Sequence, residues 1–227
     1  MRLVFDIETD GLDPSVIHCI VAKDVDTKEV YKFYSDTLDE GARFLSEAKE
    51  LIGHNIMDYD LRVMRKFYPD LYEDLKCKVV DTLVLSRLIW PDRKEKDFVL
   101  FRKGVLHPQL IGRHSLEAWG YRIGEYKGEF GETSDWQTFS AEMLEYCRQD
   151  VVVNVKLFKR IEALNYSEDA IELEHDIHQI LIHQEHDGFP FDEAKAQSLF
   201  ITLNERRQEI ERELTERQPP WIEETEF

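Results

Sequence analysis

The first 34 residues alternate between apolar and polar positions with the two-residue period of β-strands. This pattern predicts three strands, over residues 2–7, 16–23 and 29–34. Turn-forming residues separate them, with Asp10-Gly11 after the first strand and Asp-Thr-Lys at 26–28 after the second. Because short turns join antiparallel neighbours, the chain is predicted to open with an antiparallel meander.

Helical spacing of apolar residues follows, and it predicts a helix over residues 39–51 that runs into the apolar stretch Leu51-Ile52-Gly53. A second helix is expected to end near residue 67, and Val79-Val80 is expected to form a short strand. Further helices are predicted over 82–89 and over 141–164. Residues 90–112 are predicted to be a long basic connection, and connections of this length are usually functional or mobile.

Two highly charged helices are predicted at the C-terminal end, over residues 168–187 and 192–217. Strands come first, helices are then interleaved with them, and only helices follow. This order favours an α/β domain with a C-terminal helical pair. We therefore expect a domain of residues 1–165 and a helical segment of residues 166–227.

The composition is that of a globular protein, with 42% hydrophobic and 33% charged residues. No apolar run approaches the ~20 residues that a membrane span needs, and Asp6 comes too early for a signal peptide. Cys19, Cys77 and Cys147 share no metal-binding or redox spacing, which favours reduced thiols. We expect a soluble intracellular protein with no membrane partner.

The net charge of −18 at first argues against a nucleic-acid partner. However, residues 162–227 hold 18 acids and 5 bases, whereas residues 82–127 hold 9 bases and 5 acids. Such a basic segment can contact phosphates while the acidic remainder keeps non-specific affinity low. Arg102, Lys103 and Arg113 are the candidate phosphate contacts, although a solvated surface loop explains the same segment equally well.

The first predicted strand carries Asp6-Ile7-Glu8. Because alternate side chains of a strand share a face, Asp6 and Glu8 project together at the sheet edge. Two acids on an otherwise apolar strand resist burial unless a cation pairs with them, and carboxylates alone suit Mg²⁺ or Mn²⁺ better than Zn²⁺. The pair is a weak signal by itself, since about two such triplets are expected by chance in so acidic a chain.

Two further acids lie far along the chain. Asp60 is expected at the start of the second helix, with Asp58 as its competitor. Asp150 follows Tyr146 by four positions on the long helix, so the two side chains share a face, and the phenol can reach water near the carboxylate. Each acid taken alone is equally well explained as a surface carboxylate or a helix cap.

Together these residues resemble the three motifs of the DEDD superfamily of exonucleases, in its tyrosine subtype. The motifs occur in the superfamily's order, as Asp6-x-Glu8, Asn55 to Tyr59-Asp60, and Tyr146-x-x-x-Asp150. Residue 145 is Glu, so the histidine variant of the third motif is not matched.

The resemblance extends beyond these motifs. Residues 6–12 resemble the proofreading domain of family A DNA polymerases, and residues 81–89 and 116–129 resemble the T7-like phage branch of that family. Residues 172–192 are similar to the start of the polymerase portion, whereas neither a polymerase palm signature nor the family's thioredoxin-binding insertion is found. The resemblance therefore implies an excised fragment or a split gene product that does not itself add nucleotides.

The resemblance implies a ribonuclease H-like fold, a mixed sheet flanked by helices, and 3′–5′ DNA exonuclease activity. Hydrolysis would use two divalent ions, Mg²⁺ or Mn²⁺, and would release 5′-monophosphates. The implied metal ligands are Asp6, Glu8, Asp60 and Asp150. The catalytic set adds Tyr146, which would orient the attacking water.

The resemblance also implies a single-stranded DNA 3′ end as substrate. Leu12, His54 and Asn55 would contact the terminal nucleotide. Phe130 or Tyr126 is a candidate to stack on a base, although a core position explains either residue equally well. The implied partner is a polymerase domain or a separate polymerase subunit, in the cytoplasm of a phage-infected bacterium.

Two alternative functions stay open, an RNA-directed nuclease of the same fold and a non-catalytic nucleic-acid-binding module. A histidine cluster on the helix over 168–187 is a further candidate metal site, but it lies opposite an apolar face, so we expect it to be solvated. Its members are His175, His178, His183 and His186. Residues 223–226 are expected to belong to a disordered tail.

Overall fold

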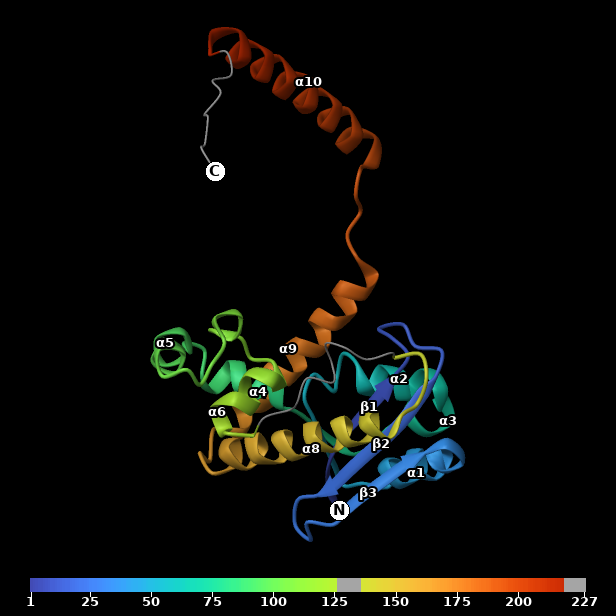
Figure 1. The fold of residues 1–227 in the computed structure, drawn as a ribbon. Helices are drawn as coiled ribbons and strands as arrows, with labels where there is room; N and C mark the ends of the chain where they lie inside the picture. Colours follow the sequence, from blue (N-terminus) through green and yellow to red (C-terminus); the bar gives the residue numbers. More distant parts are fainter. Residues whose placement is uncertain (126–135, 219–227) are drawn as a thin grey trace. The chain divides into compact units, whose positions relative to one another are not determined.

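The computed structural model describes residues 1–125 and 136–218, and it contains a five-stranded sheet (Figure 1). The strands are β1 (Arg2–Thr9), β2 (Ile17–Asp24), β3 (Val30–Tyr34), β4 (Glu50–Gly53) and β5 (Lys78–Asp81). Their order across the sheet is β3-β2-β1-β4-β5. β1, β2 and β3 are antiparallel neighbours, as predicted, whereas β4 and β5 run parallel to β1, so the sheet is mixed.

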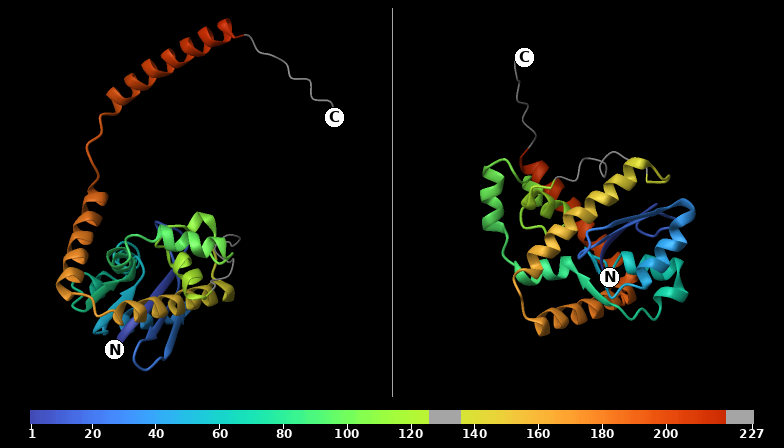
Figure 2. Two further views of the ribbon diagram at one scale, coloured as in Figure 1. Left: turned by 90° about the vertical axis from the view of Figure 1, so that its left-hand side faces the viewer. Right: turned by 90° about the horizontal axis from the view of Figure 1, so that it is seen from below.

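Helices cover both faces of this sheet (Figures 1 and 2). One core holds Leu3, Phe5 and Ile7 of β1 together with helices α1 (Leu38–Ser46), α2 (Asp60–Phe67) and α3 (Pro69–Tyr72). The other core holds Val4 together with α4 (Thr82–Ile89), α6 (Leu116–Ile123) and α8 (Ala141–Glu162). Because side chains alternate along a strand, positions 6 and 8 of β1 face the α8 side, like Val4.

The helix predicted over residues 39–51 is wrong in its second half. Helix α1 ends at Ser46, and the apolar stretch that follows forms strand β4. Leu51 and Ile52 are fully buried, one in each core, and both pair with β1. A strand buried on both faces shows a continuous apolar run, so its sequence does not reveal a period of two.

The connection predicted over residues 90–112 is largely structured. It contains α5 (Lys94–Arg102) and a 3₁₀ turn (Pro108–Leu110), and α6 follows shortly after it. Only Asp97 is buried among the residues of α5. A helix that buries a charged residue shows no apolar periodicity, which is why the pattern does not predict it.

Asp97 is the residue that ties α5 to α6. Its carboxylate accepts hydrogen bonds from Arg122 at 3.0 and 2.6 Å and from the backbone N–H of Gly112 at 2.9 Å. Burial would raise the pKa of Asp97, but the hydrogen bonds and positive charge around it outweigh this effect and lower the pKa. The guanidinium groups of Arg122 and Arg93 also lie over the ring of Trp119, at 4.9 and 5.1 Å from its centroid.

The predicted C-terminal helices are present as α9 (Glu168–Asp187) and α10 (Glu193–Arg217). Contacts divide the chain into two units, residues 1–183 and residues 184–227, so most of α9 groups with the sheet. The boundary expected near residue 165 stays a proposal. In the described ranges, none of the helices has the length and apolar character required to cross a membrane.

The expectation that the histidines of α9 form a solvated face is wrong for His175. His175 is only 9% exposed, whereas Leu173 and Ile177 on the same helix are 57% and 42% exposed. The Nε2 atom of His175 accepts a hydrogen bond from the backbone N–H of Asp81 at 2.8 Å, and this contact turns the histidine inward. Sequence periodicity cannot reveal it, because the two residues lie 94 positions apart.

The Asp97–Arg122 pair yields a stability prediction. Asp97→Asn is expected to lower the free energy of unfolding by about 3 kcal/mol, because it leaves the buried guanidinium of Arg122 without a counter-charge. Asp92→Asn, at an exposed position just before α5, is the matched control and should leave stability unchanged. Urea unfolding followed by circular dichroism measures both, and equal stability of the two variants would contradict the assigned role of Asp97.

Candidate active site

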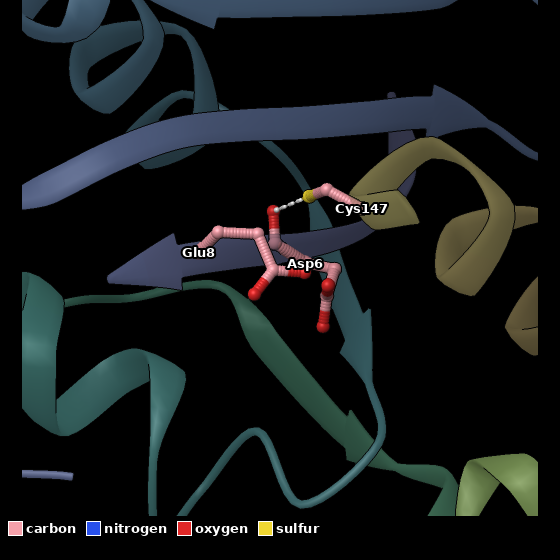
Figure 3. A group of neighbouring side chains, drawn as sticks. All are labelled: Asp6, Glu8 and Cys147. Carbon is pink, nitrogen blue, oxygen red and sulfur yellow. Dashed lines mark hydrogen bonds between the residues drawn. The ribbon is translucent and has the colours of Figure 1, made fainter. Parts of the chain in front are cut away.

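Strand β1 and helix α8 bring two carboxylates and a thiol together (Figure 3). Asp6 and Glu8 project from the same face of β1, as predicted, and Cys147 of α8 lies beside them. One potential ligand atom from each of the three lies within 4.8 Å of the others. The Sγ of Cys147 also donates a hydrogen bond to the backbone carbonyl of Asp6 at 3.4 Å, which joins α8 to the strand at this point.

A loop carries Asp60 to the same region. The parallel pairing of β1 with β4 ends at Val4 and Ile52, and the chain leaves the sheet after Gly53. A Cβ on Gly53 would lie 2.5 Å from the Cβ of Ile56, so this departure requires glycine. Asn55 then adopts a φ of 64°, a left-handed conformation that Asn tolerates better than most residues. Helix α2 begins at Asp60, as expected.

The carboxyl group of Asp60 is in an unfavourable place for a charge. Asp60 is 4% exposed, and its pKa is raised well above the usual range, first by burial and then by the negative charge of Asp6. The backbone N–H of Ile7 opposes this shift only in part. The Oδ1 atom of Asp60 is buried and has no hydrogen-bond partner among the residues that the structure describes. Such an atom is suited to a cation or a proton.

The structure distinguishes Asp60 from its competitor. Asp58 is only half-buried, whereas Asp60 is buried and its charge interacts with that of Asp6. The geometry therefore favours Asp60 as the third carboxylate.

The fourth acid, Asp150, lies on α8 one turn after Cys147 and is 7% exposed. Residues three apart on a helix share a face, so Asp150 belongs to the side of α8 that carries Cys147. Tyr146 precedes Asp150 by one turn, as predicted, and packs edge-to-face against Trp136 at 6.1 Å between ring centroids.

The sequence places Tyr59 in a motif but does not reveal that its hydroxyl holds the turn after β1. Its hydroxyl donates to the carbonyl of Gly11 at 2.8 Å and lies 2.5 Å from the hydroxyl of Thr9. Burial raises the pKa of Tyr59, and the charges of Asp60, Glu8 and Asp6 add to that shift. Tyr59 thus adjoins the acids and fixes the turn after β1.

Asp81 was also missed as a positioning residue. It is fully buried at the end of β5, where its carboxylate caps α4 by accepting from the N–H of Leu83 at 2.8 Å. The same carboxylate accepts from the N–H groups of Asn55 at 3.0 Å and Met57 at 3.2 Å. One side chain therefore fastens the loop that leads to Asp60.

The residues predicted to contact the substrate differ in their exposure and in their hydrogen bonds. Leu12 is 86% exposed. The ring nitrogens of His54 lie 2.9 Å from the hydroxyl of Thr82 and 2.9 Å from the carbonyl of His114, so this ring bridges α4 and the segment before α6. Phe130 and its alternative, Tyr126, lie outside the described residues. All four contacts, including that of Asn55, stay predictions.

A cavity of about 740 Å³ lies apart from the acids, between the β4–β5 side of the sheet and α9. It is lined by Met57, Val80 and His175 among others, and by none of the four candidate metal ligands. The carboxylates of Asp6 and Glu8, together with the buried Oδ1 of Asp60, offer oxygen ligands of the kind that a divalent cation prefers, and they are therefore the candidate site rather than this cavity.

Comparison with known proteins agrees with this arrangement. Residues 3–162 match the RNase H superfamily. The chain is also similar to the DNA-directed DNA polymerases of Escherichia phage T7 and Enterobacteria phage T3, with 32% identity over 263 aligned positions in each case. Each alignment covers 96% of this chain and 37% of the relative, so the chain spans little more than a third of these relatives. The superfamily match includes the whole sheet and α8, and this chain therefore belongs to the RNase H superfamily.

Proposed function

We propose that this chain is a metal-dependent 3′–5′ DNA exonuclease, of the tyrosine subtype of the DEDD superfamily, and the proofreading module of a phage DNA polymerase. The observation that carries the proposal is the pair of carboxylates, Asp6 and Glu8, on one face of β1, together with the buried Asp60, whose pKa is raised by burial and by the charge of Asp6. Neighbouring buried acids are unfavourable unless cations bind them. The similarity to two phage DNA polymerases supports DNA as the substrate.

Two divalent ions, Mg²⁺ or Mn²⁺, are the proposed cofactors. Asp6, Glu8 and Asp150 would hold one ion, and Asp6 with Asp60 would hold the second. When bound, the ions supply positive charge that makes a water nucleophilic and offsets the charge on the departing 3′ oxygen.

The chain's own residues position the reactants and exclude water. Glu8 and Asp60 are buried, so electrostatic interactions at the site are stronger than they would be in bulk water. Tyr146 is proposed to orient the attacking water by a hydrogen bond from its hydroxyl. Leu12 is proposed to press on the terminal base, from a turn that Tyr59 holds in place.

Helix α5 is a proposed contact surface for the substrate strand. Arg102 and Lys103 are exposed at its C-terminal end, and Phe98 and Phe101 are 47% and 42% exposed on the same helix. Cations pair with phosphates and aromatic rings stack on unpaired bases, and this combination is typical of single-strand binding. Arg113, also exposed, is a further proposed phosphate contact.

The proposed partner is a polymerase domain or subunit, and the proposed location is the cytoplasm of the infected bacterium. The chain's similarity to part of two phage polymerases supports both. Apolar side chains exposed on α9 offer a surface for such a partner. They are Leu173, Ile177, Ile180 and Leu181.

The direction of digestion and the role of the acids are tested together. A 3′-labelled single-stranded oligonucleotide should lose its label at once with Mg²⁺ or Mn²⁺, a 5′-labelled one only at the end, and chelator should stop both. Asp6→Ala should abolish release, and Asp60→Ala should slow it by about 10²–10³-fold, the usual effect of losing one group that stabilises the transition state. Asp58→Ala is the matched control and should leave the rate unchanged.

Release that survives Asp6→Ala, or label lost first from the 5′ end, would contradict the proposal. Faster digestion of a matched RNA would favour the RNA-directed alternative. An unsubstituted chain that binds the oligonucleotide without digesting it would favour the non-catalytic one.

Metal binding yields a stability prediction that does not depend on activity. At an ion concentration 100 times the dissociation constant, the folded chain should gain about 2.7 kcal/mol over the chain in chelator. Asp60→Asn should raise the melting temperature in chelator, because a buried carboxyl with a raised pKa disfavours folding above its ordinary titration range. The same variant should lose most of the gain from Mn²⁺. Differential scanning calorimetry measures both effects, and a melt indifferent to Mg²⁺ and Mn²⁺ would count against the site.

The contribution of α5 is tested by salt dependence. Arg102→Ala with Lys103→Ala should raise the KM for single-stranded DNA and leave kcat unchanged. Since each phosphate contact with a single strand contributes about 0.7, the slope of log KM against log salt should fall by about 1.4. Lys49→Ala with Lys76→Ala, at exposed positions outside the basic segment, is the control. An unchanged slope would show that α5 is only a solvated surface.

A further inference from the structure

His175 is the residue of α9 that makes a buried hydrogen bond to the sheet. It is the one buried residue of α9, a helix that is described along its full length. The cavity of about 740 Å³ lies beside it, so the helix covers the sheet loosely. Ile171 of the same helix is half-buried against the core, so His175 and Ile171 are the contacts of α9 to consider.

Two hydrogen bonds fix the imidazole ring. The Nδ1 atom donates to the carbonyl of Ile171 at 2.7 Å, one turn earlier on α9. The Nε2 atom is then the acceptor for the backbone N–H of Asp81 at 2.8 Å. Asp81 ends β5, the edge strand of the sheet, so α9 supplies the partner that an edge N–H lacks.

The side chain of Asp81 extends this contact to the loop between β4 and α2, residues 54–59. While its N–H is held by His175, its carboxylate accepts from the N–H groups of Asn55 and Met57. These residues begin the loop that ends at Asp60. Hydrogen bonds thus link α9, through Asp81, to the loop that precedes a candidate metal ligand.

We propose that His175 is a positioning residue for the exonuclease site. By holding the backbone of Asp81, it keeps the Asp81 carboxylate aligned with the loop and so keeps Asp60 in place. The proposal rests on the proposed exonuclease function for its catalytic consequence, whereas the contacts themselves are independent of any activity.

Three variants of the whole chain test the proposal. His175→Leu fills the same space without an acceptor, His175→Gln restores an acceptor oxygen, and His183→Leu is a control at an exposed position of the same helix. His175→Leu is expected to lower kcat by about ten-fold and to raise the Mn²⁺ concentration needed for half-maximal rate, as losses of supporting contacts behind metal ligands do. The KM for DNA should be unchanged. His175→Gln should recover most of the activity.

Amide hydrogen exchange, measured by NMR in chelator, tests the contacts without any catalysis. In His175→Leu, the amides of Asp81, Asn55 and Met57 should exchange about five-fold faster, as expected when one hydrogen bond is lost. The same amides should keep their rates in His183→Leu.

Unchanged exchange at these amides in His175→Leu, or an equal loss of activity in His183→Leu, would overturn the proposal. Faster exchange in a chain whose unsubstituted form digests no DNA would instead support the contacts and reject the nuclease. The two failures are therefore distinguishable.

Discussion

Repulsion between carboxylates that are held together away from water is the constraint on which the site depends. Asp60 is buried and lies within the influence of Asp6, and its pKa is raised as a result. Such an arrangement opposes folding, so other contacts must hold the acids in place. The fold supplies these contacts. Strand β1 places the side chains of Asp6 and Glu8 on one face, and Cys147 of α8 donates a hydrogen bond to the backbone carbonyl of Asp6.

The loop before Asp60 shows how this support works. The parallel pairing of β1 and β4 is short, and the chain leaves the sheet where the acids of β1 begin. Gly53 allows the chain to leave the sheet, and Asn55 adopts the left-handed conformation. The carboxylate of Asp81 accepts a hydrogen bond from the backbone of this loop. An acid that supports the site, Asp81, is thus fully hydrogen-bonded, whereas Asp60, the acid proposed to bind a metal, has a buried oxygen without a partner in the described chain.

Local patterns predicted the parts of this molecule that local forces determine. Alternation predicted the meander that the structure contains. The site residues were named from the resemblance of the motifs to a family, and they stay a prediction, although Asp60 is buried as a candidate ligand would be. Strand β4 was not predicted because its two faces are buried in two different cores, which gives a continuous apolar run. Helix α5 was not predicted because its buried residue is the charged Asp97. The inward turn of His175 depends on a residue 94 positions away, which no local pattern contains.

The position of His175 determines where the chain can be truncated without exposing the sheet of the proposed nuclease. A cut near residue 165 would retain every acid of the site, yet it would remove the helix that shields the outer strand β5. An uncovered edge strand invites pairing with other chains, so such a truncated protein would tend to aggregate. The compact unit that contains the sheet therefore extends to residue 183, into the stretch that resembles the start of a polymerase.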